Sequence, residues 1–272
     1  MQATFCTLAI AALSLVAWPA AGREPEAAPP FEEVRRLAAP AAGQAVAVDD
    51  RHFYAIDNHR VEKYDRRTGA RVDSWEGPED GPILHLNSGV VIGGFLYCAH
   101  SNYPAVPMWS SIEIFDTATL EPVLSHSFGI QQGSATWVGR RDGHWWVAFA
   151  HYEGHGGEPG KGPAWTSLVR FDEQWRRIAG YVFPEAVVRR FAGRSSSGGA
   201  WGRDGRLYTT GHDAPEIYVL ELPLAGAALE LVSIRPAPIH GQGIAWDPRD
   251  PHLLWGIDRR SQEVVVMKDA AP

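Results

Sequence analysis

Five segments of the chain have similar patterns, and each ends an apolar stretch on an acidic or imidazole side chain. The segments are residues 52–57, 95–100, 146–151, 207–212 and 253–258, and their last residues are Asp57, His100, His151, His212 and Asp258. If the five segments are arranged around an axis, three histidines from adjacent segments lie on one side of a ring, and two aspartates complete the ring. This arrangement predicts a functional site, either a metal centre or an acid–base centre.

The residue types favour a divalent transition metal, because neutral imidazoles bind such ions and three histidines leave a coordination position open. His100, His151 and His212 are the candidate ligands, and His240 is a possible fourth. Asp57 and Asp258 are the candidate catalytic residues, which would orient the imidazoles or transfer protons. Without a metal, the same residues could still transfer protons, since imidazole titrates near neutral pH. In a structural alternative, the histidines bond the backbone of a neighbouring repeat.

The elements that position these residues form a repeat of four strands with a period of about 45 to 60 residues. A Gly-, Ser- and Ala-rich strand comes first, followed by the strand that ends at the Asp/His position and by two alternating strands. This order predicts a five-bladed β-propeller, with small residues where the inner strands crowd the axis. The fifth repeat lacks a fourth strand, and we expect residues 31–37 to supply it, with Val34 and Leu37 as anchors. The predicted propeller covers residues 31–272.

In a propeller, the first strand starts and the second strand ends on the same face. The polar residues Gln44, Asn87 and Gln242, together with His85, therefore share one rim with the Asp/His positions, and we predict that they bind a ligand. The longest loop on this face, residues 152–166, is rich in Gly and Pro and is a candidate lid. Trp109 and Trp165 are carried by loops and are further candidate ligand contacts.

Composition excludes several classes of partner. The net charge of -7, without a basic cluster, argues against nucleic acid and anionic membranes as partners. Residues 1–22 have the apolar core and small-residue end of a signal peptide, and the apolar run is shorter than the roughly 20 residues of a membrane span. We therefore expect a periplasmic or secreted monomer, with residues 23–30 as a disordered lead-in.

The Tyr64-Asp65 and Thr68-Gly69 turn resembles those of YVTN/NHL-like bacterial propellers, and this similarity implies the same architecture over the mature chain. A fainter resemblance, through Gln242-Gly-Ile and Thr136-Trp137, is to the five-bladed glutaminyl-peptide cyclotransferases. The characteristic first-blade motif of that family is not found in the sequence.

Two hypotheses for function follow. The first is an exported, metal-dependent enzyme, either a hydrolase, a lyase or a cyclotransferase-like protein, that acts on a small polar substrate. The second is a non-catalytic propeller that binds a ligand or a protein through the same face.

Overall fold

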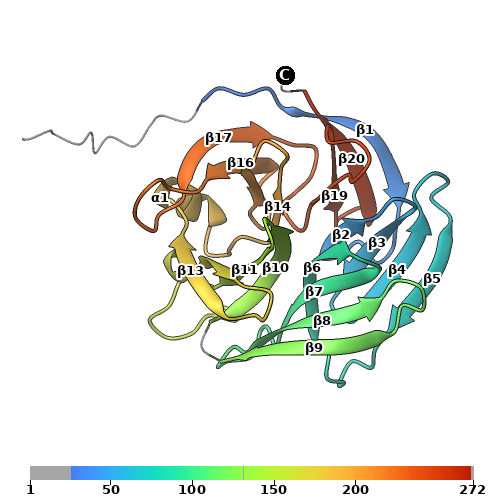
Figure 1. The fold of residues 1–272 in the computed structure, drawn as a ribbon, viewed down its shortest axis with the longest axis horizontal. Coiled ribbons are helices and arrows are strands. Elements are labelled where there is room, and N and C mark those ends of the chain that lie inside the picture. The colour runs from blue at the N-terminus through green and yellow to red at the C-terminus, as the bar shows by residue number, and fades with distance from the viewer. Residues whose placement is uncertain (1–25, 131, 271–272) are drawn as a thin grey trace, which may run out of the picture.

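The computed structural model describes residues 26–130 and 132–270. The predicted signal peptide, residues 1–22, lies outside this range. The described residues form five four-stranded antiparallel sheets in a ring, the blades of a five-bladed propeller (Figure 1), so the predicted architecture is confirmed. No helix in the described part of the chain is long and apolar enough to cross a membrane.

Each of the first four blades uses four consecutive strands, ordered from the axis outward. Blade one has β2 (Ala45–Val48), β3 (His52–Asp57), β4 (Arg60–Asp65) and β5 (Arg71–Glu76), and blade two has β6 (His85–Ile92), β7 (Phe95–Ser101), β8 (Ser110–Asp116) and β9 (Pro122–Gly129). Blade three has β10 (Ser134–Arg141), β11 (His144–Ala150), β12 (Ser167–Phe171) and β13 (Arg177–Val182), and blade four has β14 (Gly198–Trp201), β15 (Leu207–Thr210), β16 (Glu216–Glu221) and β17 (Glu230–Pro236). Between blades three and four lies the short helix α1 (Glu185–Val188).

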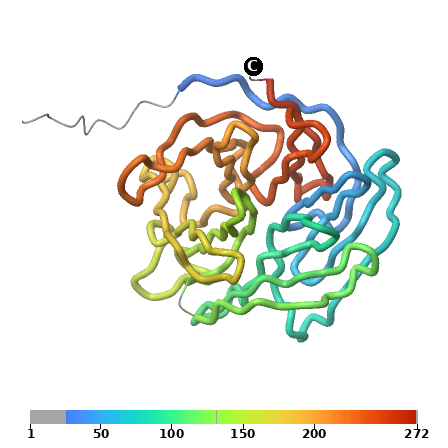
Figure 2. Tube along the Cα trace, in the orientation of Figure 1, coloured from blue at the N-terminus to red at the C-terminus, as the bar shows by residue number. Residues whose placement is uncertain are grey.

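Blade five is built from both ends of the chain. It contains β18 (Ala245–Trp246), β19 (Leu253–Asp258) and β20 (Glu263–Asp269), and its outer strand is β1 (Phe31–Ala38). Strands β1 and β20 pair antiparallel from Phe31 with Asp269 to Ala38 with Glu263, and Figure 2 shows the blue strand β1 beside the red strand β20. The predicted closure is confirmed. Pairing of the two terminal strands removes free sheet edges and closes the ring.

The anchors of the closing strand differ in part from the prediction. Leu37 packs against the core between blades five and one, as expected, but the Val34 side chain is 56% exposed. Val34 falls at a β-bulge between Glu33 and Arg35, and the extra residue of a bulge is left out of the pairing. Phe31, which is buried, anchors the other end of the strand.

Residues 26–30 are not a free lead-in. The backbone N–H of Glu26 donates to the carbonyl of Val232 in β17 at 2.7 Å, and Arg235 Nε donates to the carbonyl of Pro29 at 2.8 Å. The Arg235 guanidinium also lies 4.0 Å from the ring centroid of Phe31. The described part of the predicted lead-in, residues 26–30, thus contacts β17, the outer strand of blade four.

The core is divided among the blade interfaces. Five hydrophobic clusters of buried side chains each join two consecutive blades, as where Trp137 of blade three packs against Leu207 of blade four. Near the axis, close packing leaves no room for a side chain at Gly243 or Gly199. A Cβ on Gly243 would lie 2.3 Å from Cβ of Ala45, and one on Gly199 would lie 2.4 Å from the Trp137 ring. The small residues predicted for the inner strands are thus required by close packing.

Candidate functional site

The five Asp/His positions do not converge on one point. Asp57 Oδ1 accepts the N–H of Asn58 at 2.9 Å, and Asp258 Oδ2 lies 3.3 Å from Nη1 of Arg36 on the closing strand. Each aspartate thus contacts a local partner, and neither lines a cavity with the histidines.

His100 is bonded by protein groups at both ring nitrogens. Nε2 accepts the backbone N–H of Leu84 at 2.9 Å, and Nδ1 lies 2.8 Å from Oγ of Ser111. Ser111 Oγ donates in turn to Oε1 of Glu113 at 2.5 Å. Because Nε2 accepts, Nδ1 carries the proton, so a buried chain of donors runs from Leu84 to Glu113. This is the arrangement expected of a structural histidine.

His151 lies beneath the predicted lid. Its Nδ1 is 3.4 Å from Oε2 of Glu158, whose Oε1 accepts the backbone N–H of Met108 at 3.2 Å. Lys161 Nζ donates to the same carboxylate at 3.0 Å. Glu158 therefore holds the long loop of blade three against blade two. Burial is the main cause that lowers the pKa of His151, with the Lys161 cation adding to it.

A metal centre needs three or more donor side chains in one place. Within residues 26–130 and 132–270, no group of three or more His, Cys, Asp or Glu side chains is placed to hold a metal ion. The predicted ligands His100, His151, His212 and His240 therefore do not fit a divalent transition metal, and no step below uses one.

The rim instead encloses a polar cavity of about 330 Å³ on the axis of the propeller. All five blades, with the loops that follow their strands, contribute to its wall. The lining residues are Gln44, Asn58, Leu84, His85, Asn87, Tyr103, Pro104, Thr136, Tyr152, Arg194, Ser197, His212, Gln242 and Arg259. Four of the predicted ligand-binding residues, namely Gln44, His85, Asn87 and Gln242, lie in this wall.

The inner strands close the cavity below the rim. Gly243 N–H donates to the Gln44 carbonyl at 2.9 Å, which joins blades five and one, and a Cβ on Gly198 would lie 2.3 Å from the carbonyl oxygen of Gln242. Gln242 itself has a φ of 69°, which non-glycine residues adopt rarely. Its amide Nε2 donates to the carbonyl of His212 at 3.2 Å. The close packing fixes this amide in the cavity wall.

The charges in the wall have one sign. Arg194 and Arg259 contribute guanidinium groups, and the lining contains no Asp or Glu side chain. Arg194 Nη1 lies 3.3 Å from the hydroxyl of Tyr103, and Arg259 Nη2 donates to Oδ1 of Asp213 at 3.1 Å. Asp213 is exposed and stands outside the lining, so the field inside the cavity favours an anion.

His212 connects these charges. Its Nδ1 lies 2.7 Å from Oδ2 of Asp213, and its Nε2 lies 3.2 Å from Nη1 of Arg259. Burial lowers the pKa of His212, the Asp213 carboxylate opposes that change, and the Arg259 and Arg194 cations add to it. His212 is therefore a neutral imidazole at neutral pH, with its proton on Nδ1 and a lone pair on the side of Arg259.

Another part of the wall is aromatic and neutral. The rings of His85 and Tyr103 are 5.1 Å apart, and those of Tyr103 and Tyr152 are 4.9 Å apart. Burial lowers the pKa of His85 to about 4 and raises that of Tyr152. Both groups are therefore uncharged at neutral pH and offer hydrogen bonds without charge.

Several predicted residues lie elsewhere. Trp109 packs on His100 with ring centroids 5.5 Å apart, Trp165 is 58% exposed near His151, and neither lines the cavity. His240 is also outside the lining, and its Nδ1 is buried without a hydrogen-bond partner among the described residues. Trp109, Trp165 and His240 are therefore not part of the axial wall, although loop position and pseudosymmetry predicted that they bind a ligand or a metal.

Sequence reasoning missed Arg194, Arg259, Asn58, Tyr103 and Tyr152. Three of these, Asn58, Tyr152 and Arg259, directly follow an Asp/His position in their repeats. Successive side chains of a strand point to opposite sides, so a shift of one residue exchanges the side that faces the axis. The repeat pattern therefore indicated these cavity-lining residues, but one residue after the Asp/His position that we expected to face the axis.

His212 is the exception among the five positions. Strand β15 ends at Thr210, and the chain leaves the sheet at Gly211 before His212. Since the alternation of the strand no longer applies there, the His212 side chain reaches the cavity although its counterparts in other blades do not.

No family model and no curated protein matches the chain. Among solved structures, it is similar to a chain of a mitotic checkpoint complex, with 9% identity, 97% of this chain and 99% of that chain covered, and a TM-score of 0.47. It is also similar to hydrazine synthase of Kuenenia stuttgartiensis, with 12% identity, 84% and 71% covered, and a TM-score of 0.46. The β-propeller domain of Myceliophteria thermophila Cps50 (Swd1) has 13% identity, 81% and 82% covered, and a TM-score of 0.44. Such distant similarities do not extend beyond architecture.

Proposed function

We propose that the axial cavity binds a small polar anion, with Arg194 and Arg259 as the groups that recognise its charge. The observation that carries the proposal is a wall with two guanidiniums and no carboxylate. A guanidinium offers a planar pair of N–H donors that matches a carboxylate, and such charge-assisted hydrogen bonds are stronger than neutral ones.

The rest of the wall suits a small, oxygen-rich molecule. Gln44, Asn87 and Gln242 offer amide donors and acceptors, and Tyr103 offers a ring as well as a hydroxyl. A cavity of about 330 Å³ is at the lower end of the range that proteins use for small ligands. A small di- or tricarboxylate fits both the size of the cavity and its two cations. Of the two functions considered from the sequence, a ligand-binding propeller is the one that this geometry supports.

Calorimetry with malonate and citrate at neutral pH tests the proposal. We expect binding to the wild-type protein and about tenfold weaker binding to Arg194→Gln, because one charge-assisted hydrogen-bonding group is lost. Arg177→Gln, which removes an exposed arginine of β13, is the matched control and should bind like wild type. Equal affinities of the wild-type protein and Arg194→Gln, or no binding of either carboxylate at millimolar concentration, would contradict the proposal.

Proton transfer on the bound anion is a second candidate function, because His212 has the geometry of a general base. Asp213 accepts at 2.7 Å from Nδ1 and so leaves Nε2 as the basic atom, which the Arg259 guanidinium, 3.2 Å away, must release before Nε2 can take a proton. A base at this position would exchange the methylene protons of malonate with solvent deuterium, which NMR measures directly. We expect exchange above the buffer rate that His212→Gln abolishes. Exchange at the buffer rate in wild type would exclude this second function without affecting the first.

Export of the chain is also a proposal, supported by the apolar pattern of residues 1–22 alone. Expression of the full chain in a bacterial host, followed by fractionation and N-terminal sequencing, tests it. A mature N-terminus near residue 23 in the periplasmic fraction would support export, whereas an intact N-terminus in the cytoplasm would contradict it.

A further inference from the structure

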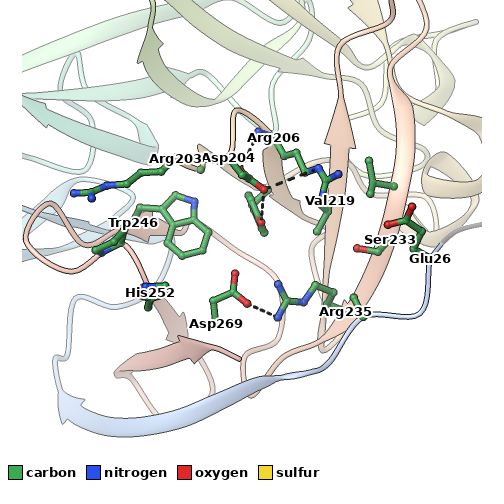
Figure 3. Close-up of a pocket in the computed structure, with 15 residues that line it drawn as sticks. Glu26, Arg203, Asp204, Arg206, Val219, Ser233, Arg235, Trp246, His252 and Asp269 are labelled. Carbon is green, nitrogen blue, oxygen red and sulfur yellow. Dashed lines mark hydrogen bonds and ion pairs between the residues drawn. The ribbon is translucent and has the colours of Figure 1, made fainter. Parts of the chain in front are cut away.

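A second and larger cavity, of about 430 Å³, lies away from the axis between blades four and five. Tyr208 and Val219 of blade four and Trp246 of blade five contribute to its wall. The segment that precedes the closing strand lines it with Glu26 and Ala28. Figure 3 shows Trp246 and His252 on one side of this cavity and Val219 and Ser233 on the other. None of its residues lines the axial cavity.

Two aromatic rings contribute to the wall of this cavity. The Trp246 and Tyr208 rings meet edge to face, with centroids 4.9 Å apart and an interplanar angle of 86°, and Trp246 is only half-buried. The Tyr208 hydroxyl donates to Oδ2 of Asp204 at 3.0 Å, whereas Nε1 of Trp246 has no hydrogen-bond partner among the described residues. Nε1 of Trp246 is buried, so the aromatic wall offers a ligand its ring face for stacking.

Some charged groups of this cavity bind other protein groups, and others do not. Asp269 accepts Nη2 of Arg235 at 2.6 Å, and Arg206 Nε donates to Oε1 of Glu221 at 2.7 Å. In contrast, the exposed guanidinium of Arg203 makes no hydrogen bond or ion pair in the described part of the chain. Asp204 and Asp269 already have hydroxyl or cationic partners, whereas the Arg203 guanidinium has none among the described residues, so Arg203 is the cation that can still bind an anion.

We propose that the cavity between blades four and five is a second binding site, which takes a planar aromatic carboxylate. The ring of the ligand would lie against Trp246 beside the apolar side chains of Val219 and Val232. Its carboxylate would bind the guanidinium of Arg203 at the rim. The volume suits a ligand of one or two fused rings. A cation is a poor match for the Asp269 carboxylate, since it would have to displace Arg235 from it.

Calorimetry with naphthalene-2-carboxylate tests the site, with two comparison ligands that each lack one feature. Cyclohexanecarboxylate keeps the charge without the aromatic ring, and naphthalene-2-methanol keeps the ring without the charge. We expect the aromatic carboxylate to bind wild type at least about tenfold more tightly than either comparison ligand, because both recognition elements must act together. Equal binding of the neutral alcohol would overturn the assignment of Arg203, and equal binding of the cyclohexane acid would overturn that of Trp246.

Two variants locate the binding event. Arg203→Gln should weaken the aromatic acid about tenfold, and Trp246→Phe should weaken it by a smaller factor while it preserves the core contact with Tyr208. Thermal melting of each variant checks the fold. Arg177→Gln is the control for loss of charge, and Arg194→Gln should leave this affinity unchanged although it weakens malonate. Wild-type affinity in Arg203→Gln and Trp246→Phe, or loss of the aromatic acid in Arg194→Gln, would contradict a separate site.

Discussion

Arg259 Nη1 lies 3.2 Å from Nε2 of His212, so the residue that follows the Asp/His position of blade five meets the residue that occupies it in blade four. Through this pair, the positive charge of Arg259 in the axial cavity acts on His212. Among the described histidines that line the cavity, His212 is the half-buried one that also contacts a carboxylate, that of Asp213. Because Arg259 acts on His212 through its charge, each partner of this histidine should move its pKa in a defined direction.

The pKa of His212 should rise in Arg259→Met and fall in Asp213→Asn. Burial is the main cause of its lowered pKa, the Asp213 hydrogen bond raises it, and the Arg259 cation lowers it. Removal of the cation therefore favours the imidazolium, and removal of the carboxylate disfavours it. Two-dimensional NMR of the imidazole nitrogens measures both. Arg260→Met, which removes the exposed neighbouring cation, is the control, and a fall of the pKa in Arg259→Met would contradict the geometry.

Acid should destabilise the propeller in part through His100. Burial, with a further contribution from His85, lowers its pKa to about 4, against about 6.5 in an unfolded chain. The folded state thus favours the neutral ring, so its contribution is complete above pH 6.5 and is lost as the pH falls toward 4. Between pH 7 and pH 5, this loss amounts to about 2 kcal/mol.

Urea unfolding of wild type and His100→Asn at pH 7 and pH 5 measures the contribution of His100 to the pH dependence of stability. The variant should be less stable at pH 7, because Leu84 N–H and Ser111 lose a partner, and should lose about 2 kcal/mol less than wild type on acidification. The difference isolates His100, since the other titrating groups are common to both proteins. Parallel pH dependences would show that His100 is not held neutral.

The segment before the closing strand should contribute less to stability than the strand itself. A chain that begins at Phe31 loses the hydrogen bonds of Glu26 and Pro29 to blade four, worth about 1–2 kcal/mol relative to a chain that begins at Glu26. A chain that begins at Ala39 loses β1 and exposes the edge of β20, which should cost several kcal/mol and promote aggregation. Thermal melting of the three chains tests the order, and similar midpoints for all three would refute closure by β1.

Gly243→Ala should destabilise the floor of the axial cavity. The added Cβ would lie 2.3 Å from Cβ of Ala45 and 2.7 Å from Oγ of Ser88, and overpacking of this kind costs about 1–3 kcal/mol. Gly139→Ala is the matched control on another inner strand, since its Cβ would meet nothing closer than 3.7 Å. The double variant Gly243→Ala with Ala45→Gly should recover part of the loss. Equal unfolding midpoints for Gly243→Ala and Gly139→Ala would contradict the close packing.

The sequence determined the architecture because the repeat is a property of local pattern. Gly- and Ala-rich inner strands, turns at fixed places and alternating outer strands recur in each blade, and the likeness between residues 40–47 and 238–245 placed β1 in blade five. The polar rim followed from strand direction alone, and for this reason Gln44, His85, Asn87 and Gln242 were found.

Only the tertiary structure decided which side chains face the axis and what they contact. His100 occupies an equivalent repeat position, yet the N–H of Leu84 and the hydroxyl of Ser111 take both of its nitrogens; Leu84 lies in a loop, and Ser111 is the partner of His100 on β8. Arg194 has no equivalent in the other repeats, because the loop that carries it occurs in one blade alone. A repeat fixes the direction of the backbone, but hydrogen bonds and charges depend on neighbours in space, and neighbours such as Leu84 and Arg194 come from loops that the repeat does not specify.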